Sequence, residues 1–85
     1  MPRLAKTPRD EFMTNIAANI KYHQTMIGAK SKVLSQVSGK ALSTYNERMQ
    51  NPEHFTIGEI YNLAKFMRVP VKDLIVGRHD ESTHI

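Results

Sequence analysis

The chain has 85 residues, of which 40% are hydrophobic and 24% charged, a composition typical of one small globular domain. It contains no cysteine, which excludes disulfide frameworks, thiolate zinc sites and cysteine nucleophiles. No apolar run approaches the roughly 20 residues of a membrane-spanning helix, and the N-terminus lacks the apolar stretch of a signal peptide. A chain of this size has little room for a deep catalytic cleft, so we expect no enzyme activity, no cofactor and no small-molecule substrate.

The positive charge is concentrated in the N-terminal part of the chain. Residues 1–52 carry eight basic and three acidic side chains, a net charge of +5. Residues 53–85 carry four basic and five acidic side chains, a net charge of −1. A basic patch attracts nucleic acid because binding releases the counterions of the phosphates. The N-terminal part is therefore the candidate for a polyanionic partner, and solubility alone is the alternative explanation of its charge.

The chain is expected to begin with a flexible arm and a helix. Residues 1–9 hold two prolines and three cations and predict a mobile basic arm. The first helix is predicted over residues 10–24, because Phe12, Ile16 and Ile20 recur at intervals of four. The arm is a candidate for tracking the DNA minor groove. Its three cations are Arg3, Lys6 and Arg9.

Two further short helices are expected around a glycine turn. The second is predicted over residues 30–38, with Val33, Leu34 and Val37 facing inward, and Gly39 marks the turn. The third helix is predicted over residues 40–50, with one apolar face and one polar face. The apolar face consists of Leu42, Tyr45 and Met49, and the polar face of Lys40, Ser43, Thr44, Glu47 and Arg48.

The fourth helix has the strongest start signal. Thr56 and Glu59 match a capping box, and Phe55 and Ile60 stand at the positions of a hydrophobic staple. This helix is predicted to run to about Arg68. Its predicted inward residues are Ile57, Ile60, Leu63, Ala64 and Met67.

A short fifth helix completes the predicted domain. Pro70 fits the start of a helix over residues 71–75, and residues 78–85 form a polar, flexible tail. The chain is therefore predicted to be all-α. It forms a compact bundle of about five short helices over residues 10–77, between the arm and the tail.

Residues 30–50 have the organisation of a helix-turn-helix, two short helices joined by a tight glycine turn. In this arrangement the DNA major groove admits the second helix, and the first helix lies across the phosphate backbone. The second helix needs one face on the protein core and one face free for base edges, which is what the predicted third helix offers.

The sequence KSKVLSQVSGKALSTYNERM, residues 30–49, resembles the helix-turn-helix of the lambda-repressor-like family, which includes phage Cro proteins and many bacterial regulators. The following Asn51-Pro52, Phe55-Thr56-Ile57, Leu63-Ala64-Lys65 and residues 69–75 resemble the characteristic ending of that family. The resemblance covers about residues 12–77. It implies the lambda-repressor-like fold, in agreement with the predicted helical bundle.

Two registers of the third helix follow from these arguments. If Gly39 takes the family's turn position, the resemblance implies that Leu42, Ser43, Asn46, Glu47 and Gln50 face DNA. Bare helical periodicity instead buries Leu42 and exposes Lys40, Ser43, Thr44, Glu47 and Arg48. Both registers place Ser43 and Glu47 at the DNA.

The chemistry of base edges suggests roles for these side chains. Glu47 can accept a hydrogen bond from cytosine N4, whereas Asn46 or Gln50 can pair bidentately with adenine. Ser43 and Thr44 can donate to bases or phosphates. The alternative for Glu47 is that it only offsets a neighbouring cation.

The predicted phosphate contacts are basic or hydroxyl groups. Lys30, Ser31 and Lys32 begin the second helix, where amides and cations suit a phosphate, and Lys40 and Arg48 are further phosphate contacts. The alternative for Lys30 and Lys32 is that they are solvated surface charges. Tyr45 is assigned to the core by its spacing, and the four histidines lack metal-ligand spacing, so no metal site is expected.

The resemblance implies a sequence-specific double-stranded DNA-binding regulator, a Cro-like repressor that occupies an operator in the cytoplasm of a bacterial or phage-infected cell. One module of this size buries little surface, so we expect a homodimer on a palindromic operator. Val71, Leu74 and Ile75 of the fifth helix and the tail are the predicted dimer contact. The alternative is an antitoxin-like or adaptor module that uses the same fold to hold a partner protein.

Overall fold

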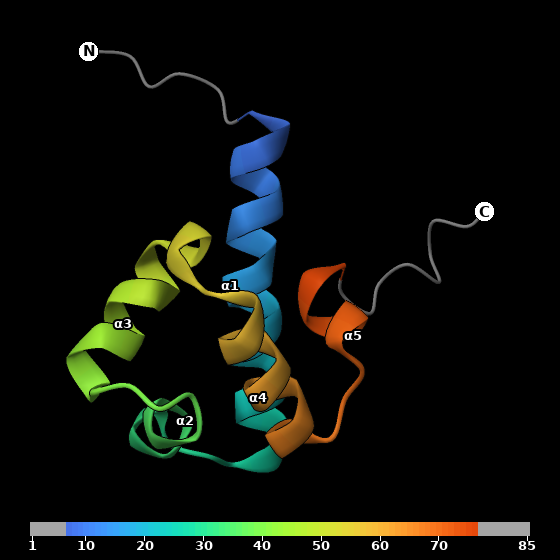
Figure 1. Cartoon of the computed structure of the whole chain (residues 1–85). Coiled ribbons are helices and arrows are strands. Elements are labelled where there is room, and N and C mark those ends of the chain that lie inside the picture. The colour runs from blue at the N-terminus through green and yellow to red at the C-terminus, as the bar shows by residue number, and fades with distance from the viewer. Residues whose placement is uncertain (1–6, 77–85) are drawn as a thin grey trace.

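The computed structural model describes residues 7–76 and folds them into helices only (Figure 1). The elements are α1 (Pro8–Ile27), α2 (Ser31–Val37), α3 (Leu42–Gln50), the 3-10 turn η1 (Pro52–His54), α4 (Ile57–Met67) and α5 (Val71–Ile75). The all-α prediction is confirmed over this range. None of the described helices is both long enough and apolar enough to cross a membrane.

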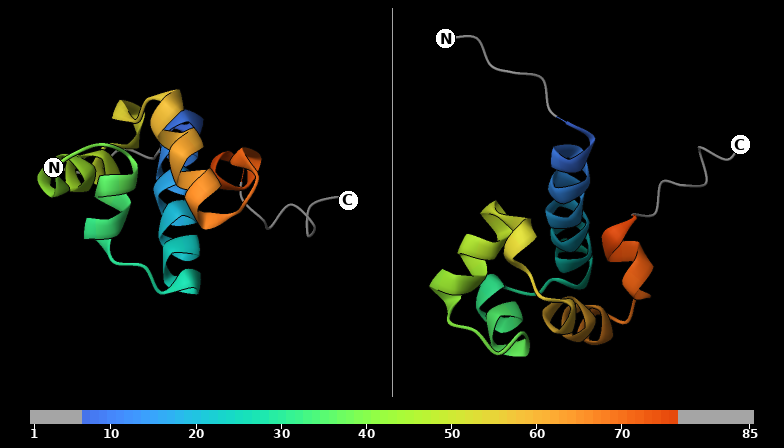
Figure 2. Two further views of the ribbon diagram at one scale, coloured as in Figure 1. Left: turned by 60° about the horizontal axis from the view of Figure 1, so that its bottom comes forward. Right: turned by 45° about the horizontal axis from the view of Figure 1, so that its top comes forward.

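The long helix α1 runs through the middle of the molecule. Helix α5 lies along one side of it, α2 and α3 lie on the other side, and α4 contacts α1, α2 and α5 (Figures 1 and 2). Each helix contributes at least one almost fully buried side chain to a common core, the largest being Ile20, Leu34, Tyr45, Leu63 and Leu74. Because all five helices share this core, each of the short ones is held by tertiary packing.

Helix α1 begins earlier than its apolar pattern predicts. Thr7 is its N-cap, and a capping box joins the Asp10 amide to Thr7 Oγ1 at 3.1 Å and the Thr7 amide to Asp10 Oδ2 at 3.3 Å. Pro8 occupies the first helical position, where its missing N–H costs nothing. The predicted arm over residues 1–9 is therefore wrong for Pro8 and Arg9. Arg3 and Lys6 lie outside the described residues.

Glycines end the first two helices as predicted, although α1 extends three residues past its predicted end at residue 24. Gly28 and Gly39 adopt left-handed conformations with φ of 70° and 77°. Helix α4 ends in the same way, but its left-handed residue is Arg68, with φ of 62°. A side chain at this position carries steric strain that glycine avoids.

Four residues that the apolar pattern predicts to face inward are exposed instead. They are Phe12, Val33, Leu42 and Ile57, with exposed fractions of 43%, 38%, 41% and 83%. Short helices bury only a narrow stripe, so apolar residues at its edges remain in contact with solvent. Leu74 shows the opposite error, because it is fully buried in the core and is not available as a dimer contact.

Candidate nucleic-acid interface

The turn between α2 and α3 positions the candidate recognition helix. The Lys40 amide donates to the Ser35 carbonyl at 2.9 Å, and the Gly39 amide donates to the Gln36 carbonyl at 3.0 Å. This pair of bonds is the Schellman closure of a helix, and it requires the left-handed conformation of Gly39. The chain leaves the turn through Lys40 and Ala41, so α3 begins at Leu42, two residues later than predicted.

Two serines lie buried in this turn, where an apolar pattern gives no signal for them. Ser35 and Ser38 are 2% and 7% exposed. The Ser35 hydroxyl donates to the Lys32 carbonyl at 2.6 Å, and the Ser38 hydroxyl donates to the Ser35 carbonyl at 2.9 Å. Buried hydroxyls are tolerated when they are hydrogen-bonded, so backbone acceptors within three residues explain the serines.

The inner face of α3 is anchored in the core by Tyr45, as predicted. Its hydroxyl donates to Gln24 Oε1 at 3.4 Å, and burial raises the pKa of this hydroxyl to about 12. Gln24 is itself buried, and its amide nitrogen donates to the Ala29 carbonyl and to Ser31 Oγ, each at 3.2 Å. One glutamine therefore joins the end of α1, the start of α2 and the inner face of α3. Ser31 is half-buried and accepts one of these bonds, so its hydroxyl proton is not used here and its phosphate contact stays a prediction.

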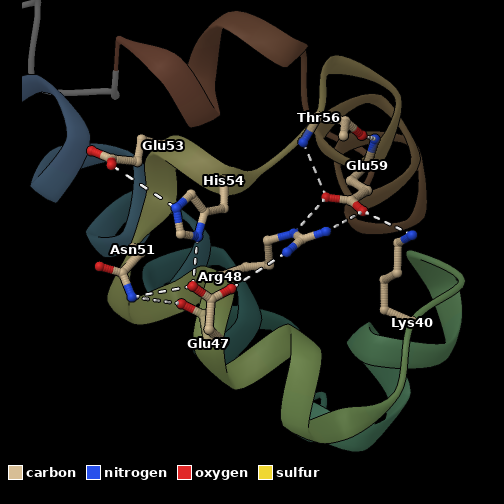
Figure 3. A network of polar contacts seen from close by, with 8 residues as sticks. All are labelled: Lys40, Glu47, Arg48, Asn51, Glu53, His54, Thr56 and Glu59. Atoms are coloured by element: carbon tan, nitrogen blue, oxygen red, sulfur yellow. Dashed lines mark hydrogen bonds and ion pairs between the residues drawn. The ribbon is translucent and has the colours of Figure 1, made fainter.

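A buried carboxylate of α4 holds the same face of α3 (Figure 3). Arg48 Nε and Nη2 lie 3.2 and 3.4 Å from the two carboxylate oxygens of Glu59, and Lys40 Nζ lies 3.6 Å from Oε2. Burial tends to raise the pKa of Glu59, but hydrogen bonds from Arg48 and the Thr56 amide outweigh burial and hold this pKa below its ordinary value. The predicted free exposure of Arg48 is wrong, because its side chain is only 19% exposed.

A second polar cluster ties the C-terminal end of α3 to η1 (Figure 3). The carboxylate of Glu47 accepts from Arg48 Nη1 at 3.3 Å and from Asn51 Nδ2 at 3.2 Å, and it lies 2.5 Å from His54 Nδ1. The hydrogen bond with His54 is the main cause that lowers the pKa of Glu47. The ion pair between Glu47 and Arg48 agrees with the alternative role considered for Glu47, in which it offsets a neighbouring cation.

Asn51 and His54 were not predicted to take part in the site. Asn51 follows Glu47 by four residues, a spacing that brings two side chains together on a helix. The hydrogen bond between Asn51 and Glu47 could therefore have been predicted from the sequence. His54 follows by seven residues across Pro52, and only the 3-10 turn of η1 brings its ring back to α3.

The outer face of α3 is open to solvent. Four side chains on this face are exposed, one apolar and three polar: Leu42, Ser43, Asn46 and Gln50. These are four of the five residues in the register based on Gly39. The register based on periodicity is wrong for Leu42, Thr44 and Arg48, since Leu42 is exposed while Thr44 and Arg48 are half-buried. Hydropathy misassigned Arg48 because its ion pair with the buried Glu59 draws the side chain toward the body of the protein.

The cations near the two helices differ in how free they are. Lys30 and Lys32 are exposed at the start of α2, and neither forms an ion pair with another residue of the 7–76 range. Lys40 forms an ion pair with Glu59. Arg9, a predicted arm residue, lies in α1 and pairs with Glu53 at 3.2 Å. Lys30 and Lys32 are thus the cations of this region that are most available to an external anion.

Comparisons with known proteins return no match, whether with family models, with curated sequences or with solved structures. The described residues contain no group of three histidines, aspartates or glutamates arranged to hold a metal ion. The geometry of α2 and α3 is therefore the basis on which a function can be argued.

Proposed function

We propose that this chain is a sequence-specific double-stranded DNA-binding regulator, similar to Cro-like repressors of the lambda-repressor-like family, and that it acts by occupying an operator. The observation that carries this proposal is the two-sided character of α3. Tyr45 and Arg48 fix one side to the body of the protein, and Leu42, Ser43, Asn46 and Gln50 leave the other side uncovered. A recognition helix needs this combination.

The dimensions and chemistry of α3 suit the major groove. A helix with its side chains is roughly 10–12 Å in diameter, and the groove is roughly 12 Å wide, so α3 can enter it. Asn46 and Gln50 are four residues apart on one face, and each can pair bidentately with adenine N6 and N7. Ser43 can donate or accept at a neighbouring base, and Leu42 offers an apolar contact for a thymine methyl group.

The phosphate contacts are assigned to the free lysines. Lys30 is the N-cap of α2 and Lys32 lies in its first turn, and α2 corresponds to the helix that crosses the backbone in a helix-turn-helix. Lys40 contributes a weaker field, because Glu59 offsets part of its charge. Arg48 is assigned to holding α3 in place, since its guanidinium is occupied by Glu59 and Glu47.

Glu47 is assigned to bracing α3 on η1. Three side-chain donors already surround its carboxylate, and a carboxylate offers roughly four acceptor sites. If this role is right, Glu47→Ala weakens binding to all DNA sequences alike. A change in the preferred bases would instead return Glu47 to base reading.

The direct test is selection of bound sequences from random DNA, followed by titration with salt. We expect an enriched palindrome whose two half-sites lie about one helical turn apart. The logarithm of the binding constant should fall linearly with the logarithm of salt concentration, since phosphate contacts release counterions. Absence of enrichment together with absence of binding at low salt would refute the proposal. That result would favour a protein-binding module of the antitoxin or adaptor type.

Lys30→Ala tests the phosphate contact. We expect weaker binding on every sequence and a slope of the salt dependence that is smaller by about one, because one phosphate contact is lost. Lys72→Ala, on the far side of α1 in helix α5, is the matched control and should leave the slope unchanged (Figure 1). An equal effect of the two variants would show that only the net charge matters.

A further inference from the structure

A row of charged side chains runs through η1, with His54 between two carboxylates (Figure 3). His54 Nδ1 lies 2.5 Å from Glu47 Oε2, and His54 Nε2 lies 4.0 Å from Glu53 Oε2. On its other side, Glu53 Oε1 accepts from Arg9 Nη1 of α1 at 3.2 Å. The ring of His54 therefore lies where polar contacts join η1 to α3 and to α1.

A neutral imidazole cannot satisfy both of these carboxylates. It has one N–H, and its other nitrogen presents a lone pair. If the N–H faces Glu47, the lone pair faces the anionic Glu53 across 4.0 Å. An imidazolium has an N–H on each nitrogen and a positive charge, so it attracts both carboxylates. The proton on His54 therefore decides whether the ring is attracted on one side or on both.

We infer that His54 is a positioning residue for α3, and that its protonated form holds the C-terminal end of this helix against η1 more firmly than its neutral form does. This role rests on the proposed function where DNA is concerned. Gln50, a proposed base reader, lies between Glu47 and Asn51 in the last turn of α3, and Glu47 is the side chain that His54 contacts. Histidine ordinarily changes charge between pH 5 and 8, so the hold on this turn should respond to pH within that range.

The neighbouring charged groups differ from histidine in this respect. They face His54 directly or through one or two partners, and they are Glu47 and Arg48 of α3, Glu53 of η1, Arg9 of α1 and Glu59 of α4. Carboxylates and guanidinium groups ordinarily keep their charge between pH 5 and 8. The pKa of Glu47 is also held below its ordinary value, chiefly by its hydrogen bond with His54. Among these groups, the histidine is therefore the one whose charge changes in this range.

The sign of the pH dependence follows from the contacts that the proton strengthens. The contacts of His54 with Glu47 and Glu53 form when the chain folds, so acid favours the folded state through His54. This stabilisation is lost as pH rises towards 8. The contribution of Glu59 has the opposite sign and is lost at lower pH, because the pKa of Glu59 lies below its ordinary value of 4.5. The two effects can therefore be measured in separate ranges.

The test measures denaturant unfolding without DNA, at about pH 5.5 and about pH 8, in the wild type and in His54→Gln. Glutamine keeps an N–H for Glu47 but cannot gain a proton, and His54 is half-exposed, so this variant is expected to fold. From pH 8 to pH 5.5, the folding equilibrium constant of the wild type should rise about threefold or more relative to that of His54→Gln. A ratio of the two constants that does not change with pH would overturn the inference.

Two further variants identify the source of this rise. His79→Gln is the matched control, because it removes an imidazole from outside the described residues and should leave the rise intact. Glu53→Gln keeps His54 but removes the anion that faces Nε2, so it should reduce the rise. A rise that His79→Gln abolishes as fully as His54→Gln, or one that Glu53→Gln leaves whole, would overturn the role of His54 between two carboxylates.

The last measurement follows the same variants on the selected operator at fixed salt. The affinity of the wild type relative to that of His54→Gln should be about threefold higher at the lower pH, because the firmer hold favours the bound orientation of α3. The outcomes separate the two proposals. A pH-dependent stability through His54 without any DNA binding would remove the proposed function alone. DNA binding with the same pH dependence in both chains would remove the role of His54 alone.

Discussion

The two sides of α3 perform different tasks with neighbouring residues. The inner side holds Tyr45, which is 1% exposed, and Arg48, which reaches a carboxylate that is itself 5% exposed. The outer side holds Ser43 and Asn46, which are exposed to solvent. The residues that stabilise α3 and the residues proposed to recognise DNA therefore lie on opposite sides of the same helix. Single substitutions can thus alter stability or recognition alone.

Glu59 explains why the inner side is so firmly held. Its side chain accepts from the Thr56 amide at 3.0 Å, while its own amide donates to Thr56 Oγ1 at 3.1 Å. The same carboxylate receives Arg48 from α3. One residue thus caps α4 and anchors the candidate recognition helix, which couples the start of one helix to the orientation of the other.

The largest effect is expected for Tyr45→Ala, on the inner side. Loss of a large buried aromatic side chain should lower the free energy of unfolding by about 4 kcal/mol, because a cavity remains in the shared core. Denaturant unfolding measures this loss. Tyr61→Ala is the control, because Tyr61 is 53% exposed and its removal should cost less than about 1 kcal/mol. Similar losses in the two variants would contradict the assignment of Tyr45 to the core.

A smaller effect is expected for Arg48→Ala, which leaves the buried carboxylate of Glu59 without its main donor. We expect a loss of about 2 kcal/mol at neutral pH. Adding Glu59→Gln in the same chain should recover part of this loss, because the unpaired charge is then absent. If the double variant is no more stable than Arg48→Ala, the cost does not arise from the buried carboxylate.

The pH dependence gives an independent check of the same pair. In the folded wild type the pKa of Glu59 lies below its ordinary value of 4.5. Its contribution to stability is therefore complete above that value and is lost as pH falls through the lower, folded-state pKa. Without Arg48 the largest cause that lowers this pKa is lost, so the pKa of Glu59 rises relative to the wild type and protonation in acid relieves the variant. The stability gap between wild type and Arg48→Ala should shrink as pH falls below about 5, and a constant gap would contradict this account.

The smallest effect on stability is expected for Asn46→Ala, on the outer side. The free energy of unfolding should change by less than about 0.5 kcal/mol, since the side chain is exposed. Under the proposed function, discrimination at one base position of the selected operator should weaken by about 1–3 kcal/mol. Asn62→Ala, at an exposed position of α4, is the control and should leave discrimination unchanged. Unchanged preference in Asn46→Ala would remove Asn46 from base reading.

Local signals were sufficient for much of the fold. The capping box at Thr56 and Glu59 is confirmed, as are the helix ends at Gly28 and Gly39 and the burial of Tyr45. Each of these depends on residues within a few positions of one another, through backbone hydrogen bonds or helical periodicity. The capping box of α1 was present in the sequence too, but two prolines before residue 10 pointed to an arm.

The amino-acid sequence by itself thus determined that the chain is all-helical, that glycines follow its first two helices, and which side chains anchor the first four helices in the core. Tertiary structure decided which of the two predicted registers of α3 holds. The sequence predicts Arg48 as an exposed charge, but Glu59, eleven residues further on, holds it half-buried. The sequence pattern predicts Leu42 as core, but Leu42 is the first residue of α3 and is exposed. Tertiary structure also decided the place of His54, whose ring reaches Glu47 across Pro52 only through the 3-10 turn of η1. Hydropathy describes how one helix partitions between water and core, whereas ion pairs depend on which distant residues the fold brings together.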